Sequence, residues 1–222
     1  MSWFLNFMNS SIGKKMQMAI TGILLCLFLI VHVIGNLVLF AGPNAFNTYV
    51  EALSSVKPLV RSLEVVLALM FIWHIFNGVR LTIENRKATP EKYLMNKAAE
   101  NSKLTSRTMG LTGSLIFIFL VTHLGTIWRL FQLEHGGGKF YDIVISGRFG
   151  FNNIYYTLIY IFAMALLGLH LRHGFQSAFQ TFGWNHSKYK PLISGVAVFF
   201  WLIIPLAFMS IPIYFGLLGG GN

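Results

Sequence analysis

The chain has 222 residues, of which 55% are hydrophobic and 11% are charged, and its mean hydropathy is +0.63. This composition is too apolar for a soluble domain of that length and indicates an integral membrane protein. The formal net charge of +10 would be consistent with binding to nucleic acid. The basic residues are distributed as in a membrane protein, however, with most of them on one side of the predicted spans, which argues against a nucleic-acid partner.

Five apolar stretches are long enough to cross a bilayer, which takes roughly 20 helical residues. The predicted spans are about 17–41, 60–83, 108–131, 152–178 and 191–217. An amphipathic surface segment, residues 1–15, leads into the first span. We therefore expect an all-α integral membrane protein, with a single transmembrane domain over residues 1–222.

The basic residues predict the orientation of the chain. With the N-terminus in the cytoplasm, twelve lysines and arginines lie inside and five lie outside, which satisfies the positive-inside rule. The inner ones are Lys14, Lys15, Arg80, Arg86, Lys87, Lys92, Lys97, Lys103, Arg107, Arg172, Lys188 and Lys190. The outer ones are Lys57, Arg61, Arg129, Lys139 and Arg148. Five spans then place the C-terminus outside, and the basic inner face is available to anionic membrane lipid and to a docking partner.

Four histidines lie within the predicted spans. Odd-numbered spans run outward and even-numbered spans run inward. Position within each span therefore places His32 and His123 in the outer half of the membrane and His74 and His170 in the inner half. Topology alone predicts two histidine pairs at two depths.

Two sequence repeats agree with this pairing. TGILLCLFLIVH (21–32) and TGSLIFIFLVTH (112–123) share a Thr-Gly pair whose threonine precedes a histidine by eleven residues. Eleven residues are about three helical turns, so each threonine lies on the helix stripe of its own histidine. HIFNG (74–78) and HLRHG (170–174) share a histidine followed by a glycine one turn later. That glycine removes a side chain beside the ring, as a flat macrocycle requires.

An imidazole in hydrocarbon is costly unless something binds it. Two axial imidazoles on different helices form a bis-histidine haem site, which leaves the iron no open position and suits electron transfer. We therefore predict two haem b groups, ligated by His32 with His123 and by His74 with His170. Spans 1–4 would form a four-helix haem-binding bundle, flanked by span 5. A single membrane histidine is more often a helix–helix hydrogen bond or a proton relay, and zinc or copper requires ligands clustered at one depth.

Further residues are candidates for contact with the haem propionates. His173 competes with His170 as a ligand, but it aligns with Asn77 in the repeat, so we assign it to a propionate or a backbone contact. The candidate cations are Arg80, Arg172 and Lys188 on the inner side and Arg61 and Arg129 on the outer side. Each is equally explained as an interfacial residue whose charge reaches the membrane surface.

A resemblance to a known family rests on four stretches: FLIVHVIGN, FIWHIFNGVRLTI, FLVTHLGTIWRL and GLHLRHGFQSAFQTFGW. Over essentially the whole chain, they resemble the cytochrome b membrane subunit of succinate:quinone oxidoreductases. The similar type is the single-chain, five-helix, two-haem subunit of bacterial succinate dehydrogenases and fumarate reductases. The resemblance implies that His32 and His123 bind the distal haem, and that His74 and His170 bind the proximal haem.

The resemblance also implies a location and partners. It places the chain in a bacterial cytoplasmic membrane, with an iron–sulfur subunit and a flavoprotein subunit docked on the cytoplasmic face. Loops 84–107 and 179–190 would form much of the docking surface. The membrane partner is a quinone, menaquinone or ubiquinone, bound near the distal haem toward the outer face.

A quinone site needs hydrogen-bond donors and a proton path. The polar candidates toward the outer face are Asn36, Asn47, Glu51, Trp128 and Arg129. Glu51 is the candidate for proton exchange, and a solvated loop carboxylate is the alternative interpretation of that residue.

Three functions fit the sequence to different degrees. The first is an electron-transfer subunit that links partner subunits to quinone, in either direction, with the dicarboxylate chemistry on those partners. The second is the haem b anchor of a hydrogenase or formate dehydrogenase, which the HGFQSAFQTFG stretch disfavours. The third is a proton-coupled transporter with a histidine relay, which requires broken helices and buried acids. Pro205 and Pro212 interrupt span 5, but that span has no ionisable residue.

Overall fold

The computed structural model describes residues 2–87, 107–134, 139–184 and 186–220. Within these ranges the regular structure is helical and no strand occurs. Five of the described helices are long and apolar enough to cross a membrane: Ser11–Ala41, Lys57–Lys87, Met109–Leu133, Ile154–Thr181 and Lys190–Leu217. The predicted all-α fold with five membrane spans is confirmed.

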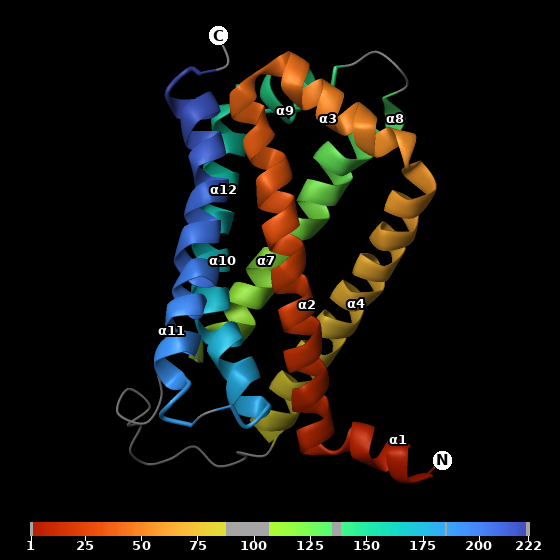
Figure 1. Cartoon of the computed structure of the whole chain (residues 1–222), viewed down its shortest axis with the longest axis vertical. Coiled ribbons are helices and arrows are strands. Elements are labelled where there is room, and N and C mark those ends of the chain that lie inside the picture. The colour runs from red at the N-terminus through yellow and green to blue at the C-terminus, as the bar shows by residue number, and fades with distance from the viewer. Residues whose placement is uncertain (1, 88–106, 135–138, 185, 221–222) are drawn as a thin grey trace.

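The first span is α2 (Ser11–Leu37), extended by the 3-10 helix η1 (Val38–Ala41). It begins before residue 17, the predicted start, because Ser10 caps it: the Ser10 hydroxyl accepts a hydrogen bond from the Gly13 N–H at 3.0 Å. The short helix α1 (Ser2–Asn9) extends sideways from this end of α2 (Figure 1). A side chain at Gly13 would run into the backbone of α1, so the glycine permits this close approach.

The remaining spans alternate in direction. The second is α4 (Lys57–Lys87), which α3 (Pro43–Ser55) joins to the first span across the opposite end of the bundle (Figure 1). The third comprises α7 (Met109–His123), the π-helical turn η2 (Leu124–Trp128) and α8 (Arg129–Leu133). α9 (Phe140–Ile145) packs beside α3, and the fourth span is α10 (Ile154–Thr181). The fifth comprises α11 (Lys190–Val198), η3 (Phe199–Ile203), α12 (Ile204–Pro212) and η4 (Ile213–Leu217).

The two ends of the chain lie at opposite ends of the bundle (Figure 1). An odd number of spans requires this arrangement. We call the end near α1 the inner end and the end near α3 the outer end, after the orientation predicted above.

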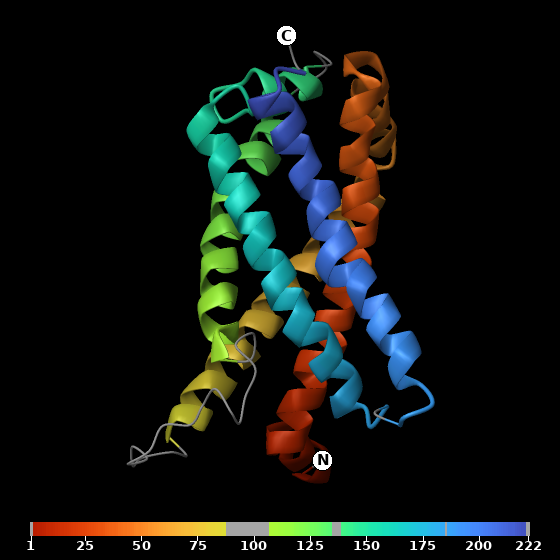
Figure 2. The ribbon, with the colours of Figure 1, turned by 90° about the vertical axis from the view of Figure 1, so that its left-hand side faces the viewer.

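Helix α10 is the centre of the bundle. It packs against α2, α7 and α12, and Figure 2 shows it running between α7 and the fifth span. Gly168 allows a close approach to the fifth span, since a Cβ there would lie 2.8 Å from the Trp201 carbonyl oxygen. The fifth span packs on α10 and α2, which agrees with its predicted flanking position.

Candidate functional site

His32 on α2 and His123 on α7 lie next to each other in the outer half of the bundle. Their ring centroids are 6.0 Å apart, and the ring planes are inclined at 82°. Two imidazoles on opposite sides of one iron, each with a nitrogen about 2 Å from the metal, have centroids about 6 Å apart. The structure therefore brings the outer pair together at a separation that axial ligation allows.

His74 on α4 and His170 on α10 form the second pair, nearer the inner end. His74 lies on the second span, and His170 and His173 lie on the fourth. All of these rings are half-buried. The structure thus brings the two residues of the outer pair together, while the inner pairing and the role of all four histidines as ligands stay predictions.

Each inner histidine contacts the threonine of a Thr-Gly pair. His74 Nδ1 lies 3.0 Å from Thr21 Oγ1, and His170 Nδ1 lies 3.4 Å from Thr112 Oγ1. Each threonine hydroxyl donates its one hydrogen to a carbonyl of its own helix, so Nδ1–H of the imidazole donates to the threonine oxygen. Nε2 then keeps its lone pair and is the nitrogen available to a metal.

The glycine after each threonine lies under the imidazole edge. A Cβ on Gly22 would lie 3.5 Å from His74 Cε1, and one on Gly113 would lie 3.3 Å from His170 Cε1. The sequence repeat identified the Thr-Gly pairs but related each to the histidine of its own span. In the structure, each pair also holds the inner histidine of the following span.

The outer histidines have different partners. His32 Nδ1 lies 3.4 Å from Asn36 Nδ2, one turn along the same helix, and that amide also donates to the His32 carbonyl at 2.7 Å. His123 Nδ1 lies 2.8 Å from the hydroxyl of Tyr160 on α10. Sequence reasoning missed Tyr160, because an aromatic residue in an apolar span gives no signal beyond packing.

The packing of the helices fits a large planar group between them. α10 has nine buried residues, whereas α4 buries Asn77 alone along its length and α7 buries Thr112 alone. α4 packs on α2 and α7 packs on α10, but α4 and α7 make few contacts with each other. Three of the four imidazoles also have Nδ1 within hydrogen-bond distance of a side-chain hydroxyl, as the predicted bis-histidine haem sites require.

The predicted propionate cations have partners within the protein. Arg80 pairs with Glu84 at 3.1 Å and donates to Asn9 Oδ1 at 3.2 Å. Glu84 also pairs at 2.6 Å with Lys14, whose side chain is buried. Two cations share one carboxylate, so this inner cluster keeps a positive charge that attracts an anionic group. Arg172 is exposed and lies over the Trp201 ring, 5.0 Å from its centroid.

Residues 16–99 match the family described as the succinate dehydrogenase/fumarate reductase transmembrane subunit. This match supports the predicted family resemblance over that segment. The matched segment contains most of α2 and all of α3 and α4, and with them one histidine of each pair and the first Thr-Gly pair. A search of curated proteins and a search of solved structures each found no match.

The predicted quinone contacts lie on two elements at the outer end. On α3, Glu51 is exposed, and Asn47 Oδ1 accepts a hydrogen bond from the Tyr141 N–H at 2.9 Å. On the third span, Arg129 is exposed, and Trp128 Nε1 donates to Glu64 Oε1 at 3.0 Å.

Glu64 on α4 is a carboxylate that sequence reasoning missed. It pairs with Arg61 at 2.7 Å and accepts from Trp128, and Gln132 contacts both Glu64 and Arg61. In the sequence, Glu64 and Arg61 only weakly indicate a functional site, because a charged pair at the start of a span ordinarily lies at the membrane interface.

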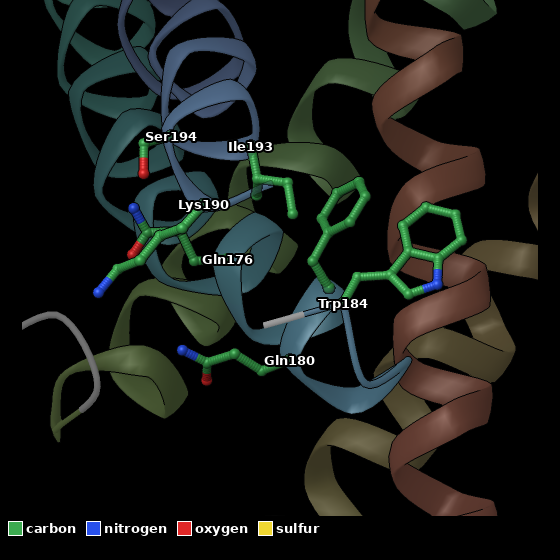
Figure 3. Close-up of a pocket in the computed structure, with 7 residues that line it drawn as sticks. Gln176, Gln180, Trp184, Lys190, Ile193 and Ser194 are labelled. Carbon is green, nitrogen blue, oxygen red and sulfur yellow. The ribbon is translucent and has the colours of Figure 1, made fainter. Parts of the chain in front are cut away.

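A polar pocket of about 300 Å³ lies at the inner end, between the end of α10 and the start of α11 (Figure 3). Its lining residues are Gln176, Phe179, Gln180, Trp184, Lys190, Ile193 and Ser194. The first four belong to the HGFQSAFQTFGW stretch, on which the family resemblance partly rests. The pocket therefore lies on the face predicted to dock the soluble subunits, away from both outer histidines.

Proposed function

We propose that this chain is the di-haem b membrane anchor of a succinate:quinone oxidoreductase, a succinate dehydrogenase or fumarate reductase. It binds an iron–sulfur subunit and a flavoprotein subunit and transfers electrons between them and membrane quinone. The observation that carries the proposal is the arrangement of four imidazoles in the spans, of which three have Nδ1 within hydrogen-bond distance of a side-chain hydroxyl that can accept its hydrogen. Two haem b groups, when bound, supply reversible one-electron carriers at two depths.

The residues of the chain hold and orient the ligands. Thr21 and Thr112 fix the inner imidazoles, and Tyr160 fixes one outer imidazole, so that Nε2 remains available on each. His32, His74, His123 and His170 would hold the two haems, which would carry single electrons and would offer no position to a substrate. Succinate or fumarate chemistry therefore belongs to the partner subunits.

Quinone binds at the outer end in this proposal. Glu51 and Asn47 on α3, Trp128 and Arg129 on the third span, and Glu64 on α4 supply polar groups there. A carboxylate in such a site exchanges protons with quinone as it is reduced or oxidised. Glu64 is half-buried and hydrogen-bonded to Trp128, whereas Glu51 is exposed, so both carboxylates are candidates for this exchange.

The soluble subunits dock at the inner end, which faces the bacterial cytoplasm with the N-terminus. The polar pocket and loop 179–190 supply amide, aromatic and basic side chains for this contact. The second predicted docking segment, 84–107, falls largely on residues 88–106, which lie outside the described part of the chain.

One spectroscopic experiment tests the proposal. The purified protein should show haem b bands in a reduced-minus-oxidised spectrum, with about two haems per chain by pyridine haemochrome. His32→Leu and His123→Leu should each remove the same haem, and His74→Leu and His170→Leu should each remove the other. His186→Leu, at an exposed position near the pocket, is the matched control and should keep both.

Different outcomes separate the alternatives. Losses that fall in other combinations overturn the ligand pairing. A folded protein that is colourless when purified from haem-replete cells overturns the proposal and favours a histidine-relay transporter. If the protein binds two haems but copurifies with a hydrogenase or formate dehydrogenase subunit, it is the haem b anchor of that enzyme instead.

A further inference from the structure

Three hydroxyl groups form a hydrogen-bonded chain that starts at the outer histidine of α7. His123 Nδ1 lies 2.8 Å from the Tyr160 hydroxyl, which lies 3.1 Å from the Tyr156 hydroxyl. Tyr156 in turn contacts the hydroxyl of Thr126 in η2, and Thr126 donates to the Thr122 carbonyl at 2.7 Å. Both tyrosines are buried, so water does not compete for these groups.

The Thr122 carbonyl, the last acceptor in this series of hydroxyl groups, determines the direction of every hydrogen bond in the series. The Thr122 carbonyl can only accept, so Thr126 gives it its one hydrogen and accepts from Tyr156. Tyr156 must then accept from Tyr160, and Tyr160 must accept from Nδ1–H of His123. The reverse direction would leave the Thr122 carbonyl without its hydroxyl donor. The network therefore leaves Nε2 of His123 as the unprotonated nitrogen.

This support differs from that of the inner histidines. Thr21 and Thr112 each pass their hydrogen directly to a carbonyl of their own helix, through a single hydroxyl. The Tyr160 hydroxyl instead donates to Tyr156, which in turn donates to Thr126. Hydrogen bonds aligned in this way in a low-dielectric interior polarise one another. Tyr160 is consequently the stronger acceptor for an imidazole N–H, and a stronger acceptor makes the imidazole a better electron donor to a metal.

We propose that Tyr160 is a positioning residue that orients the His123 imidazole and, through the hydroxyl chain behind it, lowers the reduction potential of the outer haem. The inference rests on the proposed function, because it concerns a haem ligated by His123. π-helical turns such as η2, which carries Thr126, recur at functional sites.

The hydroxyl group of Tyr160 can be removed without loss of the packing of its ring. The Tyr160 ring contacts Phe119 and Phe151 edge-on, with centroids 4.9 and 5.2 Å apart. Phenylalanine preserves these contacts, so Tyr160→Phe isolates the hydroxyl. Tyr156→Phe interrupts the chain one step farther from His123, and Tyr155→Phe changes a neighbouring exposed tyrosine as the control.

The test is a potentiometric titration of each variant in the assembled membrane complex, with the ferric haem signals followed by electron paramagnetic resonance. Tyr160→Phe should shift the equilibrium constant for reduction of one haem about tenfold toward the reduced form, which is 59 mV for one electron. Tyr156→Phe should shift the same haem in the same direction by less. The other haem and the Tyr155→Phe variant should not change.

An unchanged potential in Tyr160→Phe overturns the inference, and so does an equal shift of both haems, which indicates a general change in packing. Should Tyr160→Phe fail to retain its haem, Tyr156→Phe alone decides: a shift of the haem that His123→Leu removes supports the inference, and no shift overturns it. Absence of haem from the unmodified protein would instead overturn the proposed function, so the two failures are distinguishable.

Discussion

Thr21 and Thr112 show how one hydroxyl hydrogen determines which nitrogen of a histidine on another helix carries the proton. Because each hydroxyl is committed to a carbonyl of its own helix, only its oxygen is left for His74 or His170. In hydrocarbon no water can replace this acceptor. The threonines therefore fix which imidazole nitrogen is available, which the histidines themselves cannot do.

Replacement of Thr21 by valine should weaken binding of the inner haem about tenfold. Valine has the same shape but no oxygen, so the His74 Nδ1–H is left without a partner at a cost of about 1–3 kcal/mol. The haem-to-protein ratio of the purified variant measures the effect, and Thr21→Ser, which keeps the hydroxyl, is the control. Thr112→Val should have a smaller effect, because its contact with His170 is longer, 3.4 Å against 3.0 Å. Full haem retention in Thr21→Val would contradict this role.

At the scale of helices, α2 with α4 and α7 with α10 make the same set of contacts. Met18 and Met109 each precede a Thr-Gly pair by three residues, and their Cε atoms lie over the glycine that follows each inner histidine. A Cβ on Gly78 would be 3.8 Å from Met18 Cε, and one on Gly174 would be 3.2 Å from Met109 Cε. The glycines, predicted to make room for a macrocycle, thus also admit a methionine of the preceding span. The two inner histidines therefore have the same local surroundings.

Substitution of Gly168 by alanine should separate α10 from the fifth span. The added Cβ would lie 2.8 Å from the Trp201 carbonyl oxygen, which belongs to a helix backbone and cannot rotate away. Overpacking of this kind costs about 1–3 kcal/mol. Thermal denaturation in detergent should show a lower Tm. Gly195→Ala on α11, where no atom lies within 4 Å of the added Cβ, should leave the Tm unchanged or raise it. Equal Tm values for the two variants would show that this contact is not tight.

For the whole molecule, the opposite positions of the termini and the uneven basic charge distinguish two ends of the bundle, to which the proposed function assigns different roles. The inner end carries the polar pocket and the Lys14–Glu84–Arg80 cluster. The outer end carries Glu51 and the Glu64 cluster. Docking and quinone binding are therefore assigned to opposite membrane surfaces, and both assignments depend on orientation.

Cysteine labelling tests that orientation. The one native cysteine, Cys26, is buried and should give little background with a membrane-impermeant maleimide. Ser146→Cys, exposed at the outer end, should be labelled in right-side-out vesicles, and Ser187→Cys, exposed at the inner end, only in inverted vesicles. The opposite result would reverse the assignment of the docking and quinone faces.

The sequence by itself determined the number of spans, the all-α class and the depth of each histidine. The bilayer demands about 20 apolar residues per helix, and depth along a helix is proportional to residue number, so both can be read from one dimension. Tertiary structure alone decided which side chains meet across helices: Thr21 with His74, Tyr160 with His123, and Glu64 with Trp128. Those contacts depend on the rotation of each helix about its axis and on the order of its neighbours. Neither is specified by hydropathy, because the apolar residues of a membrane helix face lipid and protein alike.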